Sequence, residues 1–178
     1  MSELRKHFAP LARWLHWTMA LGLLAMLFIG AGMVASVSAR HEQLIQLHKP
    51  LGIALLALAV VRLGVRLGTR QPPLPADLPR VQALAAKASH WLLYGLMLSL
   101  PLLGWAMLSA AGNPIGLGAG LRLPPLLNPD AATFALLRRA HGYLAYLLFL
   151  TVLAHLAAAL YHGLIRRDGV LRSMARGG

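Results

Sequence analysis

The chain has 178 residues, of which 58% are hydrophobic and 12% are charged, and it contains no cysteine. A soluble domain carries about twice that charged fraction, so the composition argues against a soluble globular protein. The lack of cysteine excludes disulfides, iron–sulfur clusters and covalently attached c-type haem. The net charge of +12 could suggest nucleic-acid binding, but the basic residues bracket apolar runs instead of lining one polar face.

Four long apolar runs predict an all-α integral membrane protein, because each run is long enough to cross a bilayer, which needs about 20 residues. We expect one domain over residues 1–178, a four-helix bundle with spans at residues 10–36, 44–67, 84–111 and 134–165. Pro101 predicts a kink in the third span. The Pro-rich segment 71–79 and the Gly- and Pro-rich segment 112–129 are predicted loops.

The basic residues predict the orientation of the bundle. Of the 17 Lys and Arg residues, five fall on one side: Arg40, Lys49, Arg122, Arg138 and Arg139. The other twelve (17 − 5) fall on the opposite side, near the chain ends and the 71–79 loop, and they include Arg5 and Lys6. By the positive-inside rule both termini are expected in the cytoplasm.

The first 39 residues also resemble a secretory signal, with a basic start and the small residues Val37, Ser38 and Ala39 at its end. We expect this segment to be retained. Its apolar stretch is longer than a usual signal core, and it includes His16 next to Trp17.

Histidines inside apolar spans are costly and usually functional. His141 and His155 are 14 residues apart in the fourth span, so on a helix they lie within about 40° of one face and about 21 Å apart along the axis. The simpler interpretation of any single histidine is an imidazole bonded to a neighbouring carbonyl. Two histidines on one face of the helix, with one in each leaflet, instead fit two stacked cofactors.

Depth in the membrane predicts which histidines pair. His16 lies about 9 Å from the inner end of its span and His155 about 15 Å from the same side. His48 lies about 6 Å and His141 about 10 Å from the outer side. We therefore expect His16 with His155 and His48 with His141.

Two imidazoles per site suit haem iron, which needs only two axial ligands beyond its macrocycle, whereas structural zinc normally takes four protein ligands. Gly52 follows His48 by one turn and Gly142 follows His141 directly. Such small residues would let a flat macrocycle approach, although they also serve ordinary helix packing.

The other histidines have alternative roles. His90 lies at the depth of the inner pair, where it could replace a ligand or hydrogen-bond a haem propionate or a quinone. His162 is expected at the cytoplasmic interface, and His7 and His41 are expected to be solvated.

Four stretches together resemble the bacterial cytochrome b561 family of the inner membrane. They are residues 15–17, residues 60–67 continuing to Pro72 and Pro73, residues 112–114, and His141 to His155 followed by Tyr161 and His162. The resemblance implies a multi-pass inner-membrane protein with two haem b groups, and the family's haem ligands match His16, His48, His141 and His155. It also implies the superoxide oxidase activity of one member, which passes electrons from superoxide to ubiquinone. An electron-transfer subunit serving a partner dehydrogenase or hydrogenase is the alternative that the family offers.

The outer surface suits an anionic electron donor. Lys49 adjoins His48, and Arg138 and Arg139 precede His141, so basic groups surround the outer ligands. They could steer superoxide to the site, or they could bind haem propionates or lipid phosphates.

No trusted quinone signature is present. The candidate quinone-binding residues are His90, Ser89 and Trp91 on the inner side, and Asn113 and Arg138 on the outer side.

Overall fold

The computed structural model describes residues 7–118 and 120–176. The elements, in chain order, are α1 (Pro10–Val34), α2 (Ala39–Gly68), α3 (Arg80–Ala110), β1 (Gly116–Gly118), β2 (Leu121–Arg122), α4 (Ala131–Leu160), the π-helix η1 (Tyr161–Arg166) and α5 (Val170–Ala175). Among the described residues, four helices are long and apolar enough to cross a membrane, the last being α4 continued through η1. The predicted four-helix membrane bundle is therefore confirmed.

The helix ends follow local chemistry more than hydropathy. α1 begins at Pro10. Proline suits the first helical position, because an N–H there would have no acceptor within the helix and its absence costs nothing. α2 begins at Ala39, although the apolar span was expected to begin at Leu44. The difference arises because the polar residues before Leu44 can form helix outside the hydrocarbon region of the membrane. α4 begins after Asp130, whose carboxylate accepts a 2.7 Å hydrogen bond from the Thr133 N–H.

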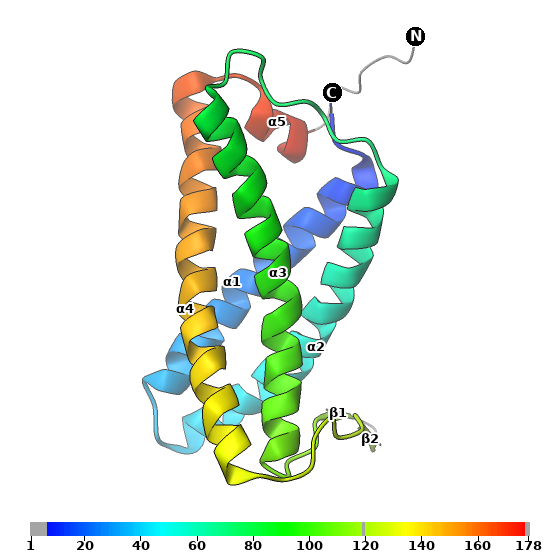
Figure 1. Cartoon of the computed structure of the whole chain (residues 1–178), viewed down its shortest axis with the longest axis vertical. Coiled ribbons are helices and arrows are strands. Elements are labelled where there is room, and N and C mark those ends of the chain that lie inside the picture. The colour runs from blue at the N-terminus through cyan, green and yellow to red at the C-terminus, as the bar shows by residue number, and fades with distance from the viewer. Residues whose placement is uncertain (1–6, 119, 177–178) are drawn as a thin grey trace.

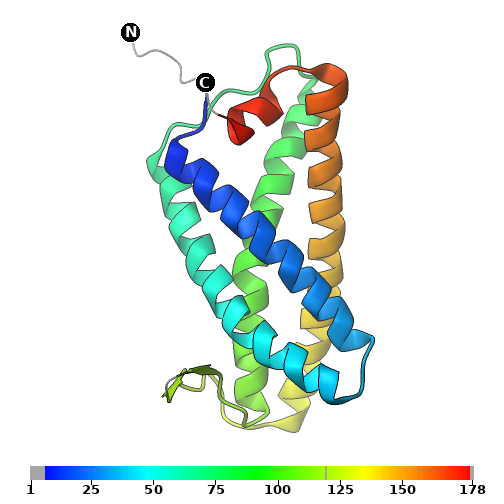
Figure 2. The same cartoon turned by 180° about the vertical axis from the view of Figure 1, so that it is seen from behind.

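The four long helices form an unevenly packed bundle (Figure 1). α1 packs along α2, α3 packs along α4, and α2 packs on α3. Figure 2 shows α1 running obliquely across the face of the bundle. A small apolar core lies between α3 and α4, built on Leu96, Leu100 and Leu148. Most other large apolar side chains point outwards, as expected for helices that lipid surrounds.

The start of α1, the end of α2, the start of α3 and the C-terminal α5 lie at one end of the bundle (Figure 1). We call this the inner end, because most of the basic residues counted above belong to it. Arg5 and Lys6, which were part of that count, lie outside the described residues. The α1–α2 turn and the β1–β2 hairpin lie at the other end, the outer end (Figure 1).

The predicted loop at the outer end is tied to α3. Trp105 Nε1 donates to the Pro124 carbonyl at 2.9 Å, and the Leu126 N–H donates to Ser109 Oγ at 3.0 Å. Within this loop β1 and β2 pair in antiparallel fashion. The loop therefore folds back against the bundle.

Candidate functional site

Two pairs of histidine rings meet inside the bundle. His16 on α1 faces His155 on α4, with ring centroids 6.2 Å apart. His48 on α2 faces His141 on α4, also with ring centroids 6.2 Å apart. These are the two pairs that helical depth predicts, one towards each end of α4.

The ring separation suits a metal ion held between two imidazoles. With bonds of about 2.0–2.1 Å from a metal ion to each imidazole nitrogen, two ligands on opposite sides of the metal place their ring centroids about 6 Å apart. Rings that interacted only by packing would not have to share one separation at two sites.

The helices that carry each pair are not closely packed against each other. Within the described residues, neither α1 with α4 nor α2 with α4 is among the closely packed helix pairs. The same residues hold no cluster of three or more His, Cys, Asp or Glu side chains placed to bind a metal ion. Each site thus offers a facing pair of imidazoles, which is the axial donor set of a six-coordinate haem, and the inner pair has His90 beside it.

The outer pair has unmet hydrogen-bonding capacity. Within the described residues, His48 Nδ1 is buried and has no hydrogen-bond partner. His141 Nδ1 is also buried and makes no well-formed hydrogen bond, although the Leu100 carbonyl lies nearby. A buried polar atom without a partner is costly, and a bound group that supplied a partner for it would remove that cost.

Gly104 on α3 explains how the His141 ring fits. A Cβ atom at position 104 would lie 3.4 Å from His141 Cε1, so the imidazole rests against glycine backbone. By contrast, a Cβ atom at Gly142 would meet nothing within 4 Å of it among the described residues. Sequence spacing missed Gly104, because only the helix rotation shows that this glycine faces the ring, and the expectation that Gly142 lets a macrocycle approach stays a prediction.

The inner pair has a third histidine beside it. The His90 ring on α3 lies 5.6 Å from that of His155, centroid to centroid. The Trp17 ring lies 5.2 Å from that of His16, and Trp17 Nε1 donates to the Met174 carbonyl of α5 at 3.2 Å. The C-terminal helix is thus anchored next to the inner pair.

The model of the prokaryotic cytochrome b561 family matches residues 7–177. The chain belongs to the prokaryotic cytochrome b561 family. This confirms the resemblance seen in the sequence, and it makes the protein a membrane electron-transfer protein of that family.

Three curated proteins are similar to this cytochrome b561. Cytochrome b561 homolog 2 of Escherichia coli (strain K12) is 30% identical over 162 residues, which cover 89% of this chain and 86% of that protein. Cytochrome b561 homolog 1 of the same organism is 31% identical, over 71% of this chain and 72% of the relative. A probable superoxide oxidase CybB of Yersinia pestis is 32% identical, over 72% of each chain.

Membership of the cytochrome b561 family implies haem b, and the two histidine pairs fit that group. The ring separation, the unpacked helix pairs and the unpartnered Nδ1 atom of His48 are independent of the family match. The role of the four histidines as ligands stays a prediction.

The basic residues expected at the outer end are where the sequence placed them. Arg138 and Arg139 are exposed and line a shallow groove along α4, together with Phe134, Tyr143 and Tyr146. Lys49 is half-buried beside His48. Arginines and tyrosines at a membrane interface suit anions, whether substrate or lipid headgroup.

The quinone candidates do not form one site. Asn113 is exposed at the outer end, in the turn after α3, and its N–H donates to the Leu108 carbonyl at 2.9 Å. His90 and Trp91 lie in the inner half of α3, and Ser89 Oγ donates within its own helix to the Ala86 carbonyl. The His90 ring contacts that of His155, a predicted ligand, so among these candidates His90 lies nearest to the inner histidine pair.

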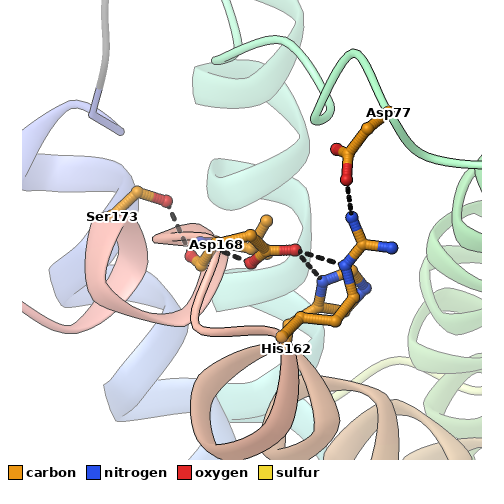
Figure 3. A network of polar contacts seen from close by, with 6 residues as sticks. Asp77, His162, Asp168 and Ser173 are labelled. Atoms are coloured by element: carbon orange, nitrogen blue, oxygen red, sulfur yellow. Dashed lines mark hydrogen bonds and ion pairs between the residues drawn. The ribbon is translucent and has the colours of Figure 1, made fainter.

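His162 is tied into a polar network at the inner end (Figure 3). Its Nδ1 atom lies 2.5 Å from Asp168 Oδ2, and Arg166 bridges Asp168 and Asp77. Partial burial alone would raise the pKa of Asp168. Hydrogen bonds from His162, the Val170 N–H and Arg166 outweigh it and hold the pKa below its usual value. This network joins η1, α5 and the 71–79 loop.

The expectation that His7 and His41 are solvated was wrong. His41 Nδ1 lies 2.9 Å from the Met33 carbonyl and is half-buried against the end of α1. His7 Nδ1 is buried and, within the described residues, has no hydrogen-bond partner. Both flank spans in the sequence, where pattern alone does not show which side chains the fold buries.

Proposed function

We propose that this cytochrome b561 is a di-haem superoxide:ubiquinone oxidoreductase of the bacterial inner membrane. Its balanced reaction takes one electron from each of two superoxide ions at the periplasmic side and reduces one ubiquinone with two protons, giving two O₂ and one ubiquinol. The similarity to a probable superoxide oxidase supports the activity. The two histidine pairs, which lie at two depths along α4, support the proposal that the chain holds two haems.

In this proposal His16 and His155 hold one haem b, and His48 and His141 hold the other. A bis-histidine haem exchanges single electrons and leaves no open iron position for oxygen. The two sites lie about 21 Å apart along α4 by helical rise, so the histidines hold the two groups on one path across the membrane.

The outer basic residues would act before any electron moves. Lys49 follows His48 in the sequence, and the exposed Arg138 and Arg139 precede His141, with Glu42 and Asp130 as the outer acidic residues. An excess of positive charge attracts a small anion and raises its encounter rate. This is the residue-level reason for an anionic donor at the outer end.

The first test is haem quantitation and an optical spectrum on the wild type and on four His→Ala variants. We expect two haems per chain in the wild type. Loss should be pairwise: His16→Ala and His155→Ala should remove the same haem, and His48→Ala and His141→Ala the other. One haem or none in the wild type, or loss that crosses the pairs, would contradict the assignment.

The second test supplies superoxide to the purified protein and follows ubiquinol formation. Steering predicts that the rate falls with added salt and that Arg138→Gln combined with Arg139→Gln lowers it by about tenfold at low ionic strength. Arg122→Gln, on the outer hairpin away from α4, is the matched control. If superoxide reduces neither haem nor quinone, while a co-purifying dehydrogenase does, the chain is an electron-transfer subunit for that partner instead.

A further inference from the structure

Two arginines beside the inner histidine pair have no role in the function proposed so far. Arg62 and Arg66 lie one turn apart on α2, inside the second span, and both are half-buried. Within the described residues neither guanidinium forms an ion pair. Positive charge at membrane depth without an anionic partner is costly, so an anion from outside the protein chain would stabilise both.

Arg62 is held next to the inner pair by contacts to two other helices. Its Nη1 atom donates to the Ala12 carbonyl of α1 at 3.1 Å, one turn before His16. Its guanidinium is also close enough to the phenol of Tyr94 on α3, a residue that is 5% exposed, to interact with it electrostatically. Arg62 is close enough to interact electrostatically with both His16 and His155.

Arg66 lies one turn closer to the inner end. Its Cζ atom is 5.6 Å from the ring centroid of Tyr94 and 5.7 Å from that of Trp91. Within the described residues its guanidinium forms no hydrogen bond. The two aromatic rings hold its position and leave its N–H donors available to a ligand.

We propose that Arg62 and Arg66 bind the propionate carboxylates of the haem held by His16 and His155. The inference rests on the proposed function, because it needs a haem at that pair. Propionates are anionic and cannot remain in hydrocarbon, so those of an inner haem extend towards the inner end. Arg62 and Arg66 lie on that side of His16, and guanidinium groups bind carboxylates with paired hydrogen bonds.

A phospholipid phosphate offers similar anionic chemistry and is the competing source. The contacts of Arg62 favour the haem, because Ala12 and Tyr94 are both buried and hold the guanidinium inside the bundle and away from the lipid surface. The helix geometry agrees with this. Arg62 is 14 residues after His48 on α2, so both lie within about 40° of one face, the face that carries the outer ligand.

The first experiment is a redox titration of full-length protein in nanodiscs of neutral lipid. Positive charge beside a haem favours its reduced form, which carries one more electron. We expect Arg62→Gln or Arg66→Gln to lower the reduction equilibrium constant of the inner haem about tenfold, which is 59 mV for a one-electron couple. Arg62→Lys should restore part of the change, and Arg139→Gln, an exposed outer arginine, should leave the inner haem unchanged.

The second experiment replaces haem b with its dimethyl ester, which has no propionate charge. The ester should bind the inner site of the wild type more weakly than haem b does. It should show no such deficit in the Arg62→Gln, Arg66→Gln double variant, because that protein has no guanidinium groups at these positions for the propionates to bind. An equal deficit in both proteins would overturn the proposal.

The outcomes separate this inference from the proposed function. A wild type without two haems contradicts the di-haem function itself. Two haems with an inner potential that does not respond to either arginine variant overturn the propionate assignment alone. An effect of the variants that appears only when anionic lipid is present assigns the arginines to a phospholipid phosphate and also overturns it. Retention of the outer haem and of helical circular dichroism shows that each variant is folded.

Discussion

The smallest unit that matters here is the imidazole ring and its immediate neighbours. His141 is fixed from one side by the glycine backbone at Gly104 and faces His48 on the other. His155 faces two rings, those of His16 and His90. The two sites therefore share a ring separation and differ in what surrounds them.

Gly104 gives a prediction at this scale. Gly104→Ala should be tolerated, because the new Cβ would sit at ordinary contact distance from His141 Cε1. Gly104→Val adds methyl groups that must displace the imidazole, so we expect most of the outer haem to be lost while the inner haem stays. Haem quantitation and the reduced-minus-oxidised spectrum measure both.

Gly95→Val, on the same helix, is the matched control, because a Cβ there meets nothing within 4 Å of it among the described residues. Equal haem loss in the Gly95 and Gly104 variants would mean that valine disturbs α3 in general and that the His141 contact is not the cause.

At the scale of elements, helical periodicity organises both sites. On α4 the spacing of 14 residues between His141 and His155 brings both rings to one face, and α2 repeats that spacing between His48 and Arg62. α1 and α3 complete the inner site with His16 and His90. α4 and α2 thus each place two polar residues along one stripe.

The C-terminal elements carry a pH-dependent contact. The folded-state pKa of Asp168 is lowered by its hydrogen bonds, so the unfolded segment binds more protons at acid pH. The stabilisation is fully present above the ordinary pKa of about 3.9 and is lost as pH falls through the lower folded value. We expect α5 to detach on acidification, measured by limited proteolysis after Arg172 or Arg176 between pH 6 and pH 3.

Asp168→Asn should make α5 protease-sensitive already at pH 6 and remove most of the pH dependence. Asp77→Asn is the control, because the Asp77 side chain is 74% exposed and exposed ion pairs contribute little. If both variants behave like the wild type, the network in Figure 3 does not hold α5.

At the scale of the whole molecule, charge asymmetry predicts how the bundle sits in the membrane. The inner end carries most of the 17 Lys and Arg residues, so both ends of the chain should be cytoplasmic. A fluorescent protein fused to the C-terminus should then fluoresce, and alkaline phosphatase fused there should be inactive. An active phosphatase fusion would invert the orientation and move the proposed superoxide-facing site to the cytoplasm.

The sequence alone determined the membrane class, the four helices and the matching depths of the histidines. These features depend on local hydropathy and on the fixed rise and period of the α-helix, which need no knowledge of neighbouring elements. The position of His141 relative to His155 on α4 could therefore be predicted from spacing. Their pairing with His48 and His16 followed from depth.

Only the tertiary structure decided which neighbours those rings have. Helix rotation and crossing brought Gly104 against His141, His90 against His155, and Arg62 and Arg66 beside the inner pair. The partner of His162 was likewise decided by the π-helix and the left-handed backbone at Arg167, which turn the chain back. Such contacts depend on the angle at which one helix meets another, and no local sequence pattern specifies that angle.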